Sequence, residues 1–334
     1  MTGVCINNII SNIINKLVYE PLEKIRQILK LTLQILICLI IVMIVPLTII
    51  ITLVCYFSFL YLKSNFYQYE KLIDILHNVK CNETSDFMNY GYWDKENMTL
   101  LEANKNLCKL IQQRGELDEV DNILDVGCGY GEQDFLWSET VKGKIRAMDI
   151  NNVSIEKAEN KNKTLKKNIH FFVGNACKLN CKKNYYDRVV SLESAFHYNP
   201  RINFLNESYR VLKKGGKLVI ADILYNDKGI DIFNSLNRTA FEKVFNIPVS
   251  NKISIDEFKR QLEGIGFSVE IEDISDKTFR PYYKYFFDNI EYSDNMMIPK
   301  WSYDIIKSTV SFYINNICGG TNGFKYVIAV CEKK

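Results

Sequence analysis

The sequence predicts an α/β protein with a doubly wound, seven-stranded parallel sheet, preceded by an N-terminal membrane segment. After residue 63, short apolar segments alternate with amphipathic helical segments, which is typical of a parallel sheet covered by helices on both faces. Residues 31–62 form an apolar run without a single charge, which is typical of a membrane segment. With 334 residues, 47% of them hydrophobic and 24% charged, the chain can bury a large core and is not a disordered chain.

Charge and cysteine content exclude several classes of partner. The 42 Lys and Arg residues against 39 Asp and Glu residues leave a formal charge of only +3, spread along the chain, so we expect no nucleic-acid partner. The ten cysteines lie far apart, two of them (Cys38 and Cys55) in the apolar run, which fits a reducing compartment better than a disulfide framework. Without a Cys-x-x-Cys motif, and with three histidines in all, we expect no metal site.

The apolar run allows two membrane arrangements. As one helix, residues 31–62 would reach about 48 Å, against a hydrocarbon core of about 30 Å. A tilted or kinked single span fits this length, and so does a re-entrant hairpin that turns at Pro46, near the middle. Residues 1–30 form an amphipathic segment with one apolar stripe, suited to the membrane interface, to packing on the rest of the protein or to pairing with a second copy.

Residues 63–334 are predicted to form a single α/β domain. A capping box, Thr99 followed by Glu102, predicts the start of an amphipathic helix. Residues 226–266 are longer than a simple crossover requires, and we expect them to include a helical cap over the site. The predicted strands are 122–126, 144–150, 170–173, 187–192, 217–223, 267–274 and 325–332.

A glycine-rich turn follows the first predicted strand. Gly127, Gly129 and Gly131 are spaced G-x-G-x-G, with Cys128 inside the motif and Asp125 two residues ahead of it. Glycines let a ligand approach the backbone, and the N–H groups at the start of the following helix favour negative charge. The spacing differs from the G-x-G-x-x-G of dinucleotide-binding enzymes, so the turn predicts a nucleotide-like ligand other than NAD.

Two further loops are expected at the same edge of the sheet. Asp149 ends the second strand, 18 residues after Gly131, where its carboxylate can accept hydrogen bonds from both hydroxyls of a ribose. Asn175, followed by Ala176, comes after the third strand, and its amide can pair with the edge of an adenine ring. Together these positions predict a cofactor that contains adenosine.

Residues 123–131, Ile-Leu-Asp-Val-Gly-Cys-Gly-Tyr-Gly, resemble the first motif of the class I S-adenosylmethionine-dependent methyltransferases, which have a Rossmann-like fold. Asp149 is similar to their ribose-binding acid, and the resemblance spans roughly residues 86–334. Residues 89–93 and 193–197 resemble the branch that acts on small molecules, including the tocopherol, sterol, phosphoethanolamine and natural-product sugar methyltransferases. The resemblance implies S-adenosylmethionine as cofactor. Asn175 departs from it, because the family usually has Asp there.

Few side chains are needed for methyl transfer, because the protein mainly holds two reactants aligned and away from water. A hydroxyl acceptor also needs a base, and His197, after the fourth strand, is the predicted base, as the Glu-x-x-x-His resemblance implies; the alternative is a histidine that packs the loop. Asp222, at the end of the fifth strand, is expected to orient His197 or bind the acceptor, or else to be solvated. Glu193 is expected to support the methionine end of the cofactor or the loop.

Aromatic residues cluster ahead of the core. Tyr90, Tyr92 and Trp93 can attract a sulfonium through their ring faces, close the pocket as a lid, or simply pack on the sheet. A second aromatic stretch, 282–287, is either core or pocket wall.

The sequence therefore predicts a membrane-anchored, S-adenosylmethionine-dependent methyltransferase that acts on a small, lipidic or otherwise membrane-partitioned acceptor. Its catalytic domain is expected to face the cytosol, where the cofactor is made. The alternative is an inactive protein of the same fold that serves as a membrane scaffold or cofactor sensor. The sequence gives no prediction of oligomeric state.

Overall fold

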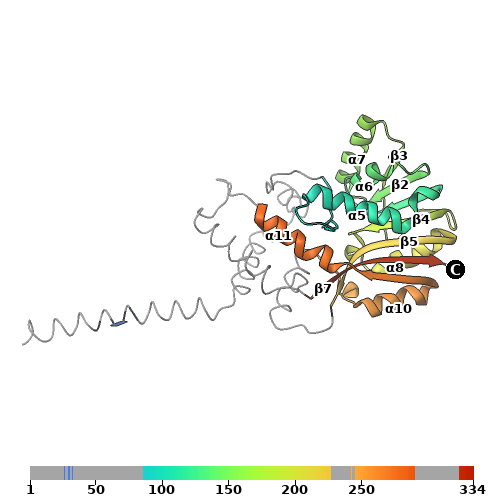
Figure 1. Ribbon diagram of the computed structural model, residues 1–334. Coiled ribbons are helices and arrows are strands. Elements are labelled where there is room, and N and C mark those ends of the chain that lie inside the picture. The colour runs from blue at the N-terminus through green and yellow to red at the C-terminus, as the bar shows by residue number, and fades with distance from the viewer. Residues whose placement is uncertain are drawn as a thin grey trace, which may run out of the picture. The chain divides into compact units, whose positions relative to one another are not determined.

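The computed structural model describes residues 26, 29, 30, 32, 86–226, 242, 245–289 and 323–334 (Figure 1). The chain divides into two compact units, Met1–Val54 and Cys55–Lys334, and the sheet belongs to the second. No helix within the described residues is long and apolar enough to span a bilayer. The predicted membrane segment, 31–62, lies outside them apart from Thr32, so its arrangement stays a prediction.

Seven strands form one sheet in the order β3-β2-β1-β4-β5-β7-β6. The seven predicted strands are confirmed, most of them to within a residue or two, while β5 begins at Leu212 rather than at residue 217. The strands are β1 Asn122–Val126, β2 Lys144–Asp149, β3 Ile169–Val173, β4 Tyr186–Leu192, β5 Leu212–Tyr225, β6 Phe267–Asp273 and β7 Phe324–Lys333.

The prediction of a wholly parallel sheet is wrong at one edge. Strands β1 to β5 pair in parallel, but β7 runs antiparallel to both of its neighbours, β5 and β6. The chain leaves β6 at the carboxyl edge of the sheet, and the connection to β7 returns at that same edge, so β7 must run the other way. Strands β2 and β3 lie on one side of β1, and β4 to β7 lie on the other side, so the strand order reverses at β1. In open α/β sheets, ligands bind at such a point, outside the carboxyl ends of the strands.

Helices cover both faces of the sheet (Figure 1). Buried apolar side chains of α5, α6 and α7 contribute to one cluster, and buried apolar side chains of α8 and α10 contribute to a second cluster on the other face. The helices are α5 Leu100–Gly115, α6 Glu132–Trp137, α7 Asn152–Leu165, α8 Arg201–Val211, α10 Ile255–Ile265 and α11 Phe279–Asn289. This is the doubly wound arrangement that the sequence predicts.

The predicted capping box is confirmed at the start of α5. The backbone N–H of Thr99 donates to the Glu102 carboxylate at 2.8 Å, and the Thr99 hydroxyl accepts from the Glu102 backbone at 3.2 Å. Satisfying these N–H groups fixes where α5 begins, directly after the segment that crosses the carboxyl edge of the sheet.

Helix α10 lies in the segment expected to form a cap. Its Phe258 and Leu262 are fully buried in the cluster that also contains α8 residues, so this part of the segment covers the sheet as a crossover helix. Residues 227–241, 243 and 244 lie outside the described residues.

Candidate active site

The glycine turn between β1 and α6 adopts a backbone that side chains disfavour. Gly127, Gly129 and Gly131 all have positive φ angles, of 82°, 54° and 77°. A Cβ atom on Gly127 would lie 1.9 Å from the Ser194 hydroxyl and 2.6 Å from the Tyr198 hydroxyl, so glycine is required there for packing. The turn therefore rests directly on the loop that follows β4.

Gly129 faces open space apart from one side chain. The nearest atom to a Cβ built on it is the Met88 sulfur, at 3.1 Å, and Met88 is 41% exposed. A ligand can reach the Gly129 backbone if Met88 moves aside, which its flexible side chain permits. The turn thus forms a cradle that fits the predicted cofactor.

Asp149 is fixed beside this cradle. One carboxylate oxygen accepts from the Gly129 backbone at 3.0 Å, and the other accepts from the Asn151 backbone at 2.8 Å. Burial raises the pKa of Asp149, and these two N–H donors act against that rise. Each carboxylate oxygen has a second lone pair, so the group can still accept from two ribose hydroxyls as predicted.

Asp125 and Cys128 lie beneath the turn rather than on its surface. Asp125 has no exposed surface, and the Gln133 amide bridges its carboxylate (2.9 Å) to the Cys128 carbonyl (3.2 Å). The Asp134 carboxyl group is equally buried, and burial raises the pKa of Asp125 to about 7 and that of Asp134 well above its usual range. These acids therefore support the turn from below, and a direct contact of Asp125 with the cofactor stays a prediction.

The third predicted loop carries Asn175 at the same edge, one strand beyond Asp149. The Asn175 side-chain oxygen accepts from the Cys177 backbone at 2.8 Å, which closes a local turn and orients the exposed amide. Ala176 is buried in the core behind it. The position fits a contact with the adenine edge, and the contact itself stays a prediction.

Glu193 connects the site to two distant parts of the chain. One carboxyl oxygen accepts from the Tyr90 backbone at 2.7 Å and from the Tyr326 hydroxyl of β7. Burial raises the pKa of Glu193 to about 8. Below that pH the group is mainly neutral, and a cation placed beside it would favour ionisation.

His197 lies on a single 3-10 turn, η3 Ala195–His197, that follows β4. Its ring packs on Phe196 with 4.0 Å between centroids, and it donates a hydrogen bond to the Phe245 backbone. Burial lowers the pKa of His197 to about 4, against the opposing effect of that hydrogen bond. The imidazole is therefore neutral at pH 7, the protonation state that a general base needs.

Asp222 differs from the prediction in place and surroundings. It does not end β5, because three residues of the strand follow it, and it is fully buried rather than solvated. Its carboxylate pairs with the buried Arg201 at 2.5 Å and accepts from the Phe196 backbone at 3.0 Å. Asp222 makes no hydrogen bond to His197 within the described structure. It therefore positions η3, and with it His197, through the Phe196 backbone, and its predicted contact with the acceptor stays a prediction.

The two aromatic stretches pack against each other. Tyr90 is buried, with its ring edge-on to Tyr282 at 4.6 Å and to Phe279 at 5.4 Å. Trp93 is also buried, and its indole N–H donates to the Tyr90 carbonyl at 2.9 Å. Packing therefore accounts for Tyr90 and Trp93, whereas Tyr92 is half-buried. The side chains at 286 and 287 lie outside the described residues.

Some residues that support the site were not predicted from the sequence. Tyr198 donates to the Val126 carbonyl at 2.8 Å and so supports the turn; its position next to the 193–197 motif was an available signal. The Asn104 amide donates to the Asn89 side-chain oxygen at 3.0 Å, which holds the segment ahead of α5. Nothing in the local pattern distinguishes Asn104 from other polar residues of an amphipathic helix.

Comparisons with known proteins agree with this geometry. A family model described as a methyltransferase domain matches residues 124–220. The erythromycin 3''-O-methyltransferase of Saccharopolyspora erythraea is 33% identical over 215 residues, which cover 61% of this chain and 70% of that protein. The 27-O-demethylrifamycin SV methyltransferase of Amycolatopsis mediterranei is 27% identical over 196 residues, covering 57% of this chain and 70% of that protein.

Solved structures share the fold. The [4+2]-cyclase SpnF superposes with a TM-score of 0.62 at 19% identity, covering 80% of this chain and 94% of that one. A "putative sarcosine dimethylglycine methyltransferase" from Galdieria sulphuraria superposes with a TM-score of 0.61 at 18% sequence identity. The match covers 76% of this chain and 96% of that one. Because one of these neighbours is titled a cyclase, the fold alone does not identify a reaction.

Proposed function

The chain belongs to the class I S-adenosylmethionine-dependent methyltransferases, in their small-molecule branch, and on that premise we propose that it methylates a hydroxyl group of a small, membrane-partitioned molecule. The observation that carries the proposal is the position of His197 on η3, three residues after Ser194, whose side chain packs directly against the glycine turn. The name of the Saccharopolyspora relative specifies an oxygen as its acceptor atom, which supports the same chemistry.

Each residue then has a definite task. S-adenosylmethionine supplies an electrophilic methyl group on a sulfonium. Asp149 holds the ribose, the Gly129 backbone allows close approach, and Glu193 receives the amino group of the methionine end. With the cofactor bound, the His197 nitrogen that carries the lone pair would take the proton of the acceptor hydroxyl, while the oxygen–methyl bond forms, the carbon–sulfur bond breaks and S-adenosylhomocysteine leaves.

An acceptor panel tests the proposed chemistry. The full chain is incubated with methyl-labelled S-adenosylmethionine and with paired compounds, an apolar alcohol and the same molecule with its hydroxyl already methylated. We expect label in the alcohol and none in its methyl ether. Equal labelling of both would place the methyl on carbon or nitrogen and refute the hydroxyl assignment.

The membrane location is also part of the proposal. Its support is the uncharged run at residues 31–62, and the cytosolic orientation follows from where the cofactor is made. A single span would place residues 1–30, with their four basic residues, on the far side of the membrane, against the usual charge bias, whereas a hairpin would not.

Protease treatment of sealed membranes tests this orientation. With tags on residues 2 and 334, we expect the C-terminal tag to be cleaved in either arrangement. Cleavage of both tags identifies a hairpin, and protection of the N-terminal tag identifies a span. Protection of the C-terminal tag would contradict the cytosolic orientation.

Glu193 makes cofactor binding depend on pH. The free protein holds a proton on this carboxyl below about pH 8, and the cationic amino group of the cofactor favours its loss. Binding therefore releases a proton, and affinity should rise between about pH 6 and 8, by up to about tenfold per unit, and level off above. Calorimetry in two buffers of different ionisation enthalpy measures the release.

The matched variant is Glu193→Gln, which keeps the shape and removes the titration. We expect weaker binding with a flat pH dependence. A slope that persists in Glu193→Gln would assign the proton to another group, such as Asp125, whose pKa burial raises to about 7.

A further inference from the structure

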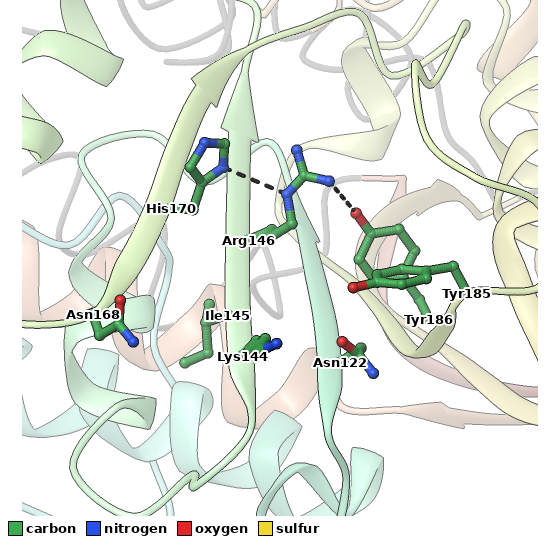
Figure 2. A pocket seen from close by; sticks show the side chains of 8 residues that line it. All are labelled: Asn122, Lys144, Ile145, Arg146, Asn168, His170, Tyr185 and Tyr186. Atoms are coloured by element: carbon green, nitrogen blue, oxygen red, sulfur yellow. Dashed lines mark hydrogen bonds between the residues drawn. The ribbon is translucent and has the colours of Figure 1, made fainter.

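A hollow lies at the edge of the sheet opposite to the glycine turn, and Figure 2 shows the side chains that line it. It has a volume of about 240 Å³ and lies where β1, β2, β3 and β4 begin, whereas the cofactor loops follow the ends of β1, β2 and β3. Its lining residues are Asn122, Lys144, Ile145, Arg146, Asn168, His170, Tyr185 and Tyr186.

The sheet register assembles this site from separate strands. Lys144 pairs with Asn122 of β1, and Arg146 pairs with His170 of β3. Because side chains alternate along a strand, Lys144 and Arg146 point to the same face of β2. Two cations are thus brought to one hollow by the fold.

Arg146 is held in a fixed orientation. Its Nε donates to His170 Nδ1 at 3.4 Å, and one terminal nitrogen donates to the Tyr186 hydroxyl at 3.0 Å (Figure 2). The guanidinium also lies over the Phe172 ring, 4.6 Å from its centre. These contacts use two of its N–H donors, and the others have no partner in the described part of the chain. An oriented guanidinium with spare donors is suited to a planar or tetrahedral oxyanion.

Among the described residues, no carboxylate pairs with either cation of the hollow. Neither Lys144 nor Arg146 forms an ion pair with any described residue. Asp187, which accepts from the Asn122 backbone at 3.0 Å, is already paired with Lys213 at 2.7 Å. Asp121 is exposed just before β1, and its carboxylate makes no ion pair with Lys144.

More lysines lie on the segments that lead into these strands. None of them forms an ion pair with a described residue, and they are Lys142, Lys166, Lys167, Lys182 and Lys183. They are dispersed in sequence, but parallel strands all begin at one edge, so the fold brings them together. The segment that leads into β1 carries Asp118, Glu119 and Asp121 instead, so the excess of positive charge that would attract an anion lies beside the starts of β2, β3 and β4.

We propose that this hollow is a binding site for a phosphate group, carried by a soluble phosphorylated compound or by a lipid headgroup. The Arg146 fork and the Lys144 ammonium match the double charge of a phosphate monoester, and the Asn122 and Asn168 amides offer neutral donors beside them. The site is separate from methyl transfer, since the length of the strands lies between it and the glycine turn.

Calorimetry with inorganic pyrophosphate tests the site. The full chain in neutral detergent micelles is titrated at constant ionic strength, and we expect saturable binding. Arg146→Gln should weaken it at least tenfold and Lys144→Gln severalfold. Lys109→Gln removes an exposed charge on α5 that forms no ion pair with a described residue, and it should change affinity less than twofold.

Two results would overturn the proposal. One is binding that does not saturate, and the other is an equal loss of affinity in Lys109→Gln and Arg146→Gln, since both indicate non-specific charge attraction. Unchanged S-adenosylmethionine affinity in Arg146→Gln verifies that the variant is folded. If Arg146→Gln does not bind S-adenosylmethionine normally, the pyrophosphate affinity of Lys144→Gln is the test instead, because Lys144 is exposed and its replacement should leave the fold intact.

Competition distinguishes the two sources of phosphate. Displacement of pyrophosphate by phosphatidate in the micelles, at concentrations where glycerol 3-phosphate has no effect, assigns a lipid headgroup. The reverse result assigns a soluble compound. Failure of both to compete would refute a site for phosphate monoesters.

Discussion

Replacing Gly129 with valine should abolish cofactor binding, with a loss of more than about a hundredfold in affinity, or more than about 2.7 kcal/mol. Gly129 has a φ angle of 54°, which a β-branched residue adopts only with strain, and a Cβ there would lie 3.1 Å from the Met88 sulfur. The valine methyl groups would then fill the space through which a ligand approaches the backbone. Calorimetry with S-adenosylmethionine on the full chain measures the loss.

Gly215 offers a matched control for backbone strain. Its φ angle is 73°, but no atom lies within 4 Å of the position a Cβ would take, and it lies near the start of β5, away from the glycine turn. Gly215→Val should therefore lower the thermal stability and leave the cofactor affinity within about twofold of wild type. Unchanged affinity in Gly129→Val would remove the turn from the binding site.

His197→Ala should lower kcat by about 10² to 10⁴ while cofactor affinity stays near wild type, because the base acts on the acceptor and not on the cofactor. The low pKa of His197 also predicts the pH dependence of kcat/KM. Since burial lowers the pKa of His197 to about 4, the imidazole stays unprotonated down to that pH, and kcat/KM should show no acid limb from His197 near pH 6.5. Steady-state kinetics over this pH range measure both effects.

An acceptor that needs no base provides the control for His197→Ala. A thiol analogue of the alcohol, present largely as thiolate at high pH, should be methylated by His197→Ala at close to the wild-type rate. A nearly unchanged rate with the alcohol would contradict the base assignment and leave His197 as a residue that packs the loop.

Local patterns made much of the fold predictable. The capping box at Thr99 and the apolar runs of the strands depend on neighbours within a few residues, so the sequence alone locates them. The direction of β7 depends instead on where a long connection returns to the sheet, which no local pattern records. The sequence therefore predicted a wholly parallel sheet.

The site was predictable to the same degree. Gly129 and Asp149 are adjacent in the structure because consecutive parallel strands end at one edge, a consequence that the sequence order already implies. The partner of Asp222 was not predictable, because Arg201 lies 21 residues away on a helix whose other buried residues, apart from Ser208, are apolar. The basic hollow was missed for a similar reason, since its charges come together only through the strand register.

Methyl transfer to a hydroxyl is tested most directly by counting both products of one reaction. The full chain is incubated with S-adenosylmethionine and an apolar alcohol that the acceptor panel identifies, and S-adenosylhomocysteine and the methyl ether are quantified together by mass spectrometry. We predict that the two form one for one and that both fall together in His197→Ala. Cofactor binding without formation of either product, for every alcohol tested, would contradict the account and favour an inactive protein that retains the fold.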